Sequence, residues 1–140
     1  MMLSEFIFRL GTALLAGLVI GFERQWHHKT AGLRTNLLVA TGAAVFVLLS
    51  IELKSEEPSI DITRIIAQVV TGVGFLGAGI IFREGNNVHG LTSAATIWCS
   101  AAIGCMAASG FFLETLICTL TVVIVNSFLT PIDDWLKNRK

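Results

Sequence analysis

The sequence predicts an all-α integral membrane protein: a single transmembrane domain over residues 1–140, built as a bundle of about five helices. Three observations predict it. Hydrophobic residues make up 54% of the chain and charged residues only 14%, whereas an average soluble domain has roughly a quarter charged residues. The mean hydropathy is +0.74. The charges fall in short clusters between long apolar runs, which is the pattern of membrane spans.

Five apolar runs supply the predicted helices, and each is about 18–20 residues long. Such a length lets a helix cross a hydrocarbon core of roughly 30 Å. These runs are too long and continuous for the strands of a membrane barrel, the other structure that satisfies its backbone in lipid. A four-span alternative, with the last run split or interfacial, stays open. The predicted spans are residues 4–22, 35–52, 64–82, 91–109 and 111–130.

The connections between the runs predict how the helices follow one another. Only Ser109 and Gly110 separate the last two spans, so we expect a tight turn between antiparallel helices. Cytoplasmic loops of membrane proteins carry an excess of Lys and Arg. Seven of the ten basic residues lie after the first span, after the third span and in the tail. We therefore expect a multi-pass protein with its N-terminus outside and its C-terminus in the cytoplasm.

The first two spans resemble the next two. GLVIGFER at 17–24 stands sixty residues before GAGIIFRE at 77–84, and AGLRTNLLVATGAA at 31–44 aligns with HGLTSAATIWCSAA at 89–102 at an offset of 58. A repeat that is two spans long keeps its direction in the membrane. The similarity therefore predicts two parallel helical hairpins followed by a fifth helix. Chance likeness between glycine-rich apolar helices is the alternative.

Polar residues at the ends of the spans predict contacts at the cytoplasmic rim. Thr35 in the first copy of the repeat, and Thr92 or Ser93 in the second, can cap the helix that follows the shared Gly-Leu pair. Free amides at such a helix start favour anions. Ordinary capping near lipid headgroups is the alternative. The residues expected to contact anions or headgroups at this rim are Glu23, Arg24, Arg34, Thr35 and Arg83.

The third span contains TGVGFLGAG, and the fourth is rich in serine and alanine. Small residues let membrane helices approach one another closely. We therefore expect these two spans to form the tightly packed centre of the bundle, and a homodimer through their small faces is the favoured oligomer. The residues expected at this helix-packing or partner interface are Gly72, Gly74, Gly77, Gly79, Thr92 and Cys99.

No enzyme signature stands out in the chain. It contains no paired-cysteine zinc spacing, no P-loop and no Ser–His–Asp arrangement. The formal net charge is +0, so no overall field favours nucleic acid. We expect no enzyme, no cofactor and no nucleic-acid partner. No Asp or Glu lies near the midpoint of a span, which counts against a self-contained Mg²⁺ channel but leaves backbone-lined or oligomeric pores open. Any metal ligands are unknown, and Mg²⁺ is considered as a ligand or a substrate.

Two segments carry a family resemblance. Residues 21–46, GFERQWHHKTAGLRTNLLVATGAAVF, and residues 61–104, from DITRIIAQVV to WCSAAIG, resemble the MgtC/SapB family of bacterial inner-membrane proteins. The resemblance implies a small inner-membrane protein tied to magnesium homeostasis, adaptation to low magnesium and virulence. It also implies regulation of partner membrane proteins, including the membrane sector of ATP synthase. Transport of Mg²⁺ or another small solute is the alternative.

The chain departs from the family pattern in two places. Many members continue with a soluble domain after the last span, and we expect the activity of that domain to be absent here. Thr92 stands where the family has Asn, while Cys99 matches the family. The polar contacts of that Asn therefore do not carry over directly, although the Thr hydroxyl can still bond a neighbouring helix.

Overall fold

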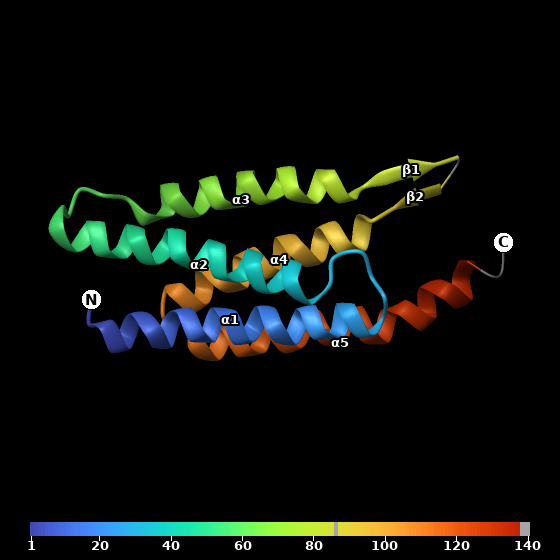
Figure 1. Ribbon diagram of the computed structural model, residues 1–140, viewed down its shortest axis with the longest axis horizontal. Helices are drawn as coiled ribbons and strands as arrows, with labels where there is room; N and C mark the ends of the chain where they lie inside the picture. The colour runs from blue at the N-terminus through green and yellow to red at the C-terminus, as the bar shows by residue number, and fades with distance from the viewer. Residues whose placement is uncertain (86, 138–140) are drawn as a thin grey trace.

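The computed structural model describes residues 1–85 and 87–137, and for 131–134, 136 and 137 it describes the backbone alone. All five helices are long and apolar enough to cross a membrane. The predicted all-α membrane bundle is confirmed, with five spans rather than four. The helices are α1 (Leu3–Trp26), α2 (Leu33–Glu56), α3 (Ile62–Ile80), α4 (Leu91–Ala108) and α5 (Phe112–Lys137), and a hairpin of β1 (Phe82–Glu84) and β2 (Asn87–His89) joins α3 to α4 (Figure 1).

The helices begin and end at other residues than the predicted spans. Both α1 and α2 have 24 residues, because helical hydrogen bonds continue through polar residues as readily as through apolar ones. α3 ends at Ile80, and the chain then reverses in the antiparallel hairpin, which pairs Phe82 with His89. The tight turn predicted after the fourth span is confirmed, with Gly110 at a φ of +89° that favours glycine.

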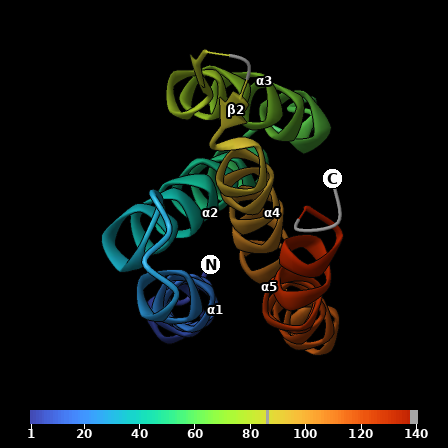
Figure 2. The ribbon, with the colours of Figure 1, turned by 90° about the vertical axis from the view of Figure 1, so that its right-hand side faces the viewer.

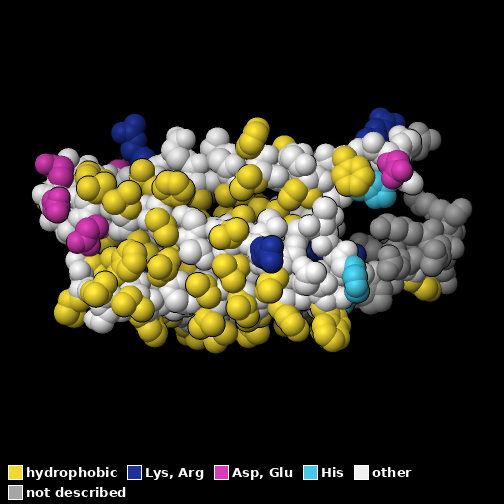
Figure 3. All heavy atoms as spheres, viewed as in Figure 1, with side chains coloured by type: hydrophobic (Ala, Val, Ile, Leu, Met, Phe, Trp, Pro, Cys, Tyr) yellow, Lys and Arg dark blue, Asp and Glu magenta, His cyan; other side chains and the backbone are white. Residues whose placement is uncertain are grey.

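The two ends of the bundle differ in the charged side chains that they carry (Figure 3). We call the end where α1 and α3 finish and α2 and α4 begin the basic end, and the opposite end the acidic end. The acidic end includes Glu52, Glu56, Glu57 and Asp61, and the basic end includes Arg24, Lys29, Arg34 and Arg83. Seen along the bundle, α4 occupies the middle, and the other helices surround it (Figure 2).

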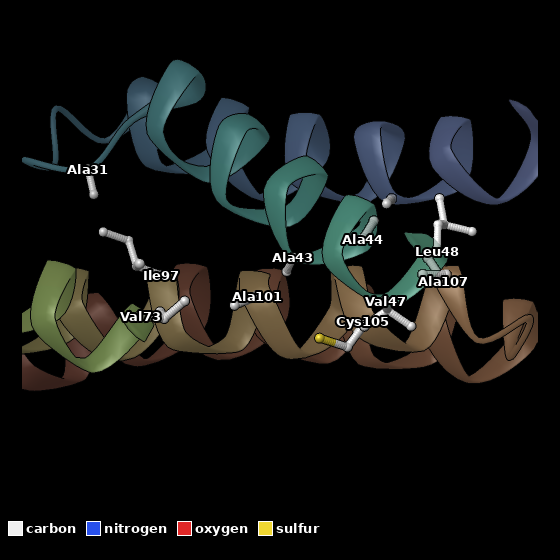
Figure 4. Close-up of a cluster of buried hydrophobic side chains, with 12 residues drawn as sticks. Ala31, Ala43, Ala44, Val47, Leu48, Val73, Ile97, Ala101, Cys105 and Ala107 are labelled. Carbon is white, nitrogen blue, oxygen red and sulfur yellow. The ribbon is translucent and has the colours of Figure 1, made fainter. Parts of the chain in front are cut away.

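Small side chains fill the core between α1, α2 and α4 (Figure 4). A Cβ added at Gly104 of α4 would collide with the backbone carbonyl of Ala40 in α2. One added at Gly17 of α1 would lie 2.8 Å from the carbonyl oxygen of Asn36 in α2. These three helices are therefore packed backbone to backbone, which is how membrane helices gain van der Waals contact.

α3 lies at the edge of the bundle, and its only buried residues are Val73 and Gly77. A Cβ added at Gly77 would lie 3.5 Å from Ala94 of α4, an ordinary contact. Nothing lies within 4 Å of a Cβ added at Gly72, Gly74 or Gly79. The prediction that the third and fourth spans form the packed centre is thus right for α4 and wrong for α3. A run of glycines permits a close neighbour without supplying one.

The repeat of two hairpins stays a prediction, and one pair of contacts supports it. In the first hairpin Gly17 faces Asn36, and in the second Gly77 faces Ala94. The sequence alignment pairs Gly17 with Gly77 and Asn36 with Ala94. The same positions therefore meet in both hairpins, although the helices of the second stand farther apart.

Candidate functional site

Buried polar side chains gather in the half of the bundle next to the basic end. They come from α1, α2, α4 and α5, and each is at most 7% exposed. Polar groups at membrane depth have to be satisfied inside the protein, so such a group of side chains marks a structural or functional centre. We call these residues the polar cluster: Glu23, Arg24, Asn36, Ser93, Thr96, Ser100 and Asn126.

Asn36 joins α2 to α4 within the polar cluster. Its Nδ2 donates to the carbonyl oxygens of Ala31 and Gly32, each at 2.9 Å, just before α2 begins. Its Oδ1 accepts a hydrogen bond of 2.8 Å from the hydroxyl of Ser100 in α4. The amide is therefore used at both ends, which fixes the loop before α2 and the position of α4 against it.

Thr96 and Asn126 connect α4 to α5 more weakly. Asn126 Nδ2 donates to Thr96 Oγ1 at 3.3 Å, and Thr96 Oγ1 also donates to the carbonyl oxygen of Thr92 at 2.8 Å. This pair belongs to the same half of the bundle as Asn36 and Ser100. Together the two pairs bond α4 to helices on two sides.

Arg24 is the charged member that meets α4. It is 1% exposed, and its Nη2 donates to the hydroxyl of Ser93 in the first turn of α4 at 2.9 Å. Among the described residues, its Nε and Nη1 have no hydrogen-bond acceptor. The predicted contact of Arg24 with anions or headgroups at the rim stays a prediction, but the side chain is buried. Helical spacing explains why, since Arg24 follows Gly17 and Ile20 on the buried face of α1.

Glu23 is also buried rather than placed at the rim, being 7% exposed. It follows Ala16 and Ile20 on the stripe of α1 that packs with residues of α5. His27 Nδ1 lies 3.0 Å from Glu23 Oε1 and 2.9 Å from the carbonyl oxygen of Glu23. Neither carboxylate oxygen makes a hydrogen bond, so the contact with His27 is electrostatic and depends on a protonated imidazole.

The other predicted rim residues lie outside the polar cluster. Arg34 is exposed and Thr35 is half-buried. Arg83 is exposed, and its Nε donates to the carbonyl oxygen of Gly85 at 2.8 Å. Their contacts with headgroups stay a prediction.

The predicted caps from Thr35, Thr92 and Ser93 are wrong. The N-caps of α2 and α4 are Gly32 and Gly90, and neither helix start has a side-chain cap. Each hydroxyl residue is the second or third residue of its helix, too far along to cap it.

The two polar residues predicted for a helix interface are seven residues apart, so they share one side of α4, and they differ in burial. Thr92 is exposed, and the neighbouring Ser93 makes the interhelical contact instead. Cys99 is half-buried. Sequence reasoning missed Ser100 and the connecting role of Asn36. Their signal was an Asn and a Ser inside apolar spans, positions that lipid disfavours unless they are bonded.

A groove of about 570 Å³ runs between α2 and α3, and we call it the α2–α3 groove. Its walls are apolar apart from Gln68. Two of its lining residues, Gly42 and Gly72, have nothing within 4 Å of an added Cβ, so the hollow comes from missing side chains. Figure 3 shows α3 standing off from the rest of this face.

The described residues do not bring metal donors together. Among the side chains that the structure describes, which leave out 86, 131–134 and 136–140, no three of His, Cys, Asp or Glu are placed to hold a metal ion. The two features that the structure does assemble are the polar cluster and the α2–α3 groove.

Comparison with known proteins identifies the family of the chain. The MgtC family model matches residues 10–135. The chain is 50% identical over 129 residues to Protein MgtC of Salmonella typhimurium (strain 14028s / SGSC 2262), covering 92% of this chain and 54% of the relative. It is 50% identical over 123 residues to Protein MgtC of Brucella abortus (strain 2308), covering 88% of this chain and 50% of the relative.

These relatives are longer proteins, and the chain spans about half the length of the curated relatives it matches. No solved structure matches it. The family match nevertheless runs through all five helices, from α1 to α5. The chain therefore belongs to the MgtC family.

Proposed function

We propose that this chain is an MgtC-like regulator that binds the transmembrane helices of other membrane proteins through the α2–α3 groove and the outer face of α3. Its setting, as the family resemblance implies, is magnesium homeostasis, adaptation to low magnesium and virulence, in the inner membrane with the N-terminus outside and the C-terminus in the cytoplasm. The observation that carries the proposal is an apolar groove beside a barely buried helix.

The shape of the groove suits a helix. Gly42 and Gly72 form open positions on facing helices, while Leu38, Phe46 and Leu76 provide large apolar walls. Helices pack by inserting the side-chain ridges of one into the grooves of another. In lipid, helices gain nothing by removing apolar surface from water, so such close packing supplies much of the association energy.

The outer face of α3 continues this surface. Ala67, Thr71, Gly74 and Ala78 are exposed and recur at intervals of four, three and four residues, so they share one face of the helix. A stripe of small residues is typical of transmembrane helix interfaces. The partners we propose are a membrane protein such as the membrane sector of ATP synthase, which the resemblance implies, and a second copy of this chain.

Filling the groove tests the proposal. Gly42→Leu and Gly72→Leu add bulk where the bundle leaves open space, so both variants should fold. We expect them to lower capture of the purified ATP synthase membrane sector, and crosslinking to a second copy in reconstituted membranes, by about tenfold, which corresponds to about 1.4 kcal/mol.

Gly11→Leu is the matched control. Gly11 lies in α1, also has nothing within 4 Å of an added Cβ, and does not line the groove. It should capture partners as the unmodified chain does. Gly77→Leu is a poor test because it also pushes α3 away from Ala94. Folded Gly42→Leu and Gly72→Leu proteins with undiminished capture of both partners would refute the proposal.

Transport is the alternative function, and a flux measurement separates it from regulation. The full chain would be reconstituted in liposomes that contain a magnesium-sensitive dye. We expect no Mg²⁺ entry above that of empty vesicles, since the span interiors offer no cluster of carboxylates to a mostly hydrated ion. Entry that depends on the protein and saturates with Mg²⁺ would favour transport.

A further inference from the structure

Two arginines of α1 lie at opposite ends of α4, and they are satisfied to very different degrees. Arg9 Nη1 donates to the carbonyl oxygen of Ala108 at 2.7 Å, where α4 ends, and Arg9 Nη2 pairs with Glu5. The C-terminal end of a helix carries partial negative charge. Although Arg9 Nε lacks an acceptor, the charge of this guanidinium meets both a carboxylate and the favourable end of α4.

Arg24 meets the other end of α4, which is unfavourable for a cation. The N-terminus of a helix carries partial positive charge, and its first amides have no partner within the helix. The N-cap Gly90 offers no side-chain oxygen to them. Among the described residues, Arg24 is hydrogen-bonded only to the uncharged hydroxyl of Ser93, and at 1% exposure its free Nε and Nη1 are closed off from solvent.

Glu23 attracts Arg24 electrostatically, but it makes no hydrogen bond to the guanidinium. Consecutive residues of a helix point about 100° apart, so the two buried side chains leave α1 in different directions. Both carboxylate oxygens of Glu23 lack a hydrogen bond, and the ion contact that this side chain makes is with His27. The buried guanidinium and the start of α4 thus form a concentration of donors and positive charge that calls for an anion.

We propose that Arg24, Ser93 and the first-turn amides of α4 bind a phosphate group. A tetrahedral phosphate offers several charged oxygens, which match a guanidinium with donors on more than one edge. Amides at a helix start are a common phosphate ligand. The site lies at an end of the bundle, where the spans meet the headgroup layer, so the group can belong to an anionic lipid or to free phosphate. This inference goes beyond the proposed function and involves no residue of the α2–α3 groove.

The experiment uses the full chain in an uncharged, phosphate-free detergent. Binding of inorganic phosphate and of short-chain phosphatidylglycerol is measured by calorimetry and by the shift of the thermal midpoint, with sodium chloride at equal ionic strength as the reference. Because Arg24 is closed off, binding requires local opening, and readings are taken at equilibrium. Tight binding of phosphatidylglycerol alone assigns a lipid headgroup, and binding of both assigns a free phosphate.

Three variants decide whether Arg24 is responsible. Loss of a charge-assisted contact in Arg24→Gln should weaken binding of the responding ligand by at least about tenfold. Lys29→Gln removes another positive charge of the same end, and the dissociation constant should stay within about twofold because surface pairs contribute little. If Arg24→Gln does not fold, Ser93→Ala keeps the charge, removes the hydroxyl contact and should weaken binding by about threefold.

Two results would overturn the proposal. One is that neither phosphate source binds more tightly than chloride. The other is that Lys29→Gln weakens binding as much as the Arg24 or Ser93 variant, since the effect would then be a general surface attraction. Neither result bears on partner capture through the groove, which the glycine variants of that groove test separately.

Discussion

Between α1, α2 and α4 the helices approach until backbone meets backbone, whereas α3 stands off and leaves cavities beside it. Both regions are rich in glycine and alanine. In the first, a glycine such as Gly104 or Gly17 has a neighbouring chain where its side chain would be. In the second, Gly72 and Gly79 face open space. The same residue type thus holds the fold together in one region and leaves a surface for another molecule in the other.

The strongest test of this difference is Gly104→Leu. The first added carbon would overlap the carbonyl of Ala40, and its carbonyl carbon lies 2.9 Å away. Backbone cannot move aside as a side-chain tip can, so we expect a loss of at least about 3 kcal/mol of folding free energy. Thermal unfolding in detergent, followed by circular dichroism, measures it. Gly42→Leu on the facing helix should change the midpoint little, and equal losses in both variants would remove the distinction.

We expect a smaller loss of folding free energy when the hydrogen bonds of Asn36 inside the packed region are removed. Asn36→Ala removes three hydrogen bonds and leaves the Ser100 hydroxyl and the carbonyl oxygen of Ala31 without this partner, while the carbonyl oxygen of Gly32 keeps its bond from the backbone amide of residue 36. The expected cost is about 2–3 kcal/mol, because buried polar groups are left unpaired. Ser100→Ala removes one of those bonds and should cost about 1 kcal/mol. If the two variants unfold at the same temperature, Asn36 does not connect the helices as described.

The tightly and loosely packed regions can be compared at matched positions, Gly17 in the α1–α2 hairpin and Gly77 in the α3–α4 hairpin. Gly77→Ala places a carbon 3.5 Å from Ala94, an ordinary contact, so it should leave stability unchanged or raise it by up to about 1 kcal/mol through helix propensity. Gly17→Ala places a carbon 2.8 Å from the Asn36 carbonyl and should destabilise by about 1–3 kcal/mol. Chemical denaturation of both variants checks the sign. A destabilising Gly77→Ala would show that the second hairpin is as tight as the first.

The number, order and type of the helices could be predicted from the sequence because each depends on local composition. An apolar run of a given length has few structures open to it in lipid, so the five spans and the turn at Ser109–Gly110 follow from the chain itself. Which glycines are in contact could not be predicted. That depends on where a distant helix lies, and the glycine-rich third span belongs to the helix with the fewest buried residues.

The polar cluster was predictable only in part, for a related reason. Arg24 stands at the end of an apolar run, and its helical spacing from Gly17 and Ile20 carries the information that it is buried. That spacing becomes decisive once Gly17 is known to face α2. Similarly, Ser100 could be placed opposite Asn36 only after α4 was known to pack against α2. Which polar residues contact one another depends on how helices distant in sequence pack, and local sequence patterns do not contain that information.

The smallest expected effect concerns the start of α3, on the loosely packed side. The hydroxyl and the amide of Thr63 donate to Asp61 Oδ1 at 2.6 and 2.9 Å, and they lower the pKa of the Asp61 carboxyl. A carboxyl whose pKa is lower in the folded state stabilises that state above its unfolded pKa and loses the contribution as the pH falls through the folded pKa. Hydrogen exchange of the Thr63 amide should therefore become faster, relative to neighbouring amides, as the pH falls from neutral to about 3. Asp61→Asn keeps an acceptor oxygen without the titration, so its relative exchange should be flat over this range. The same pH dependence in both proteins would mean that Asp61 is not the group responsible.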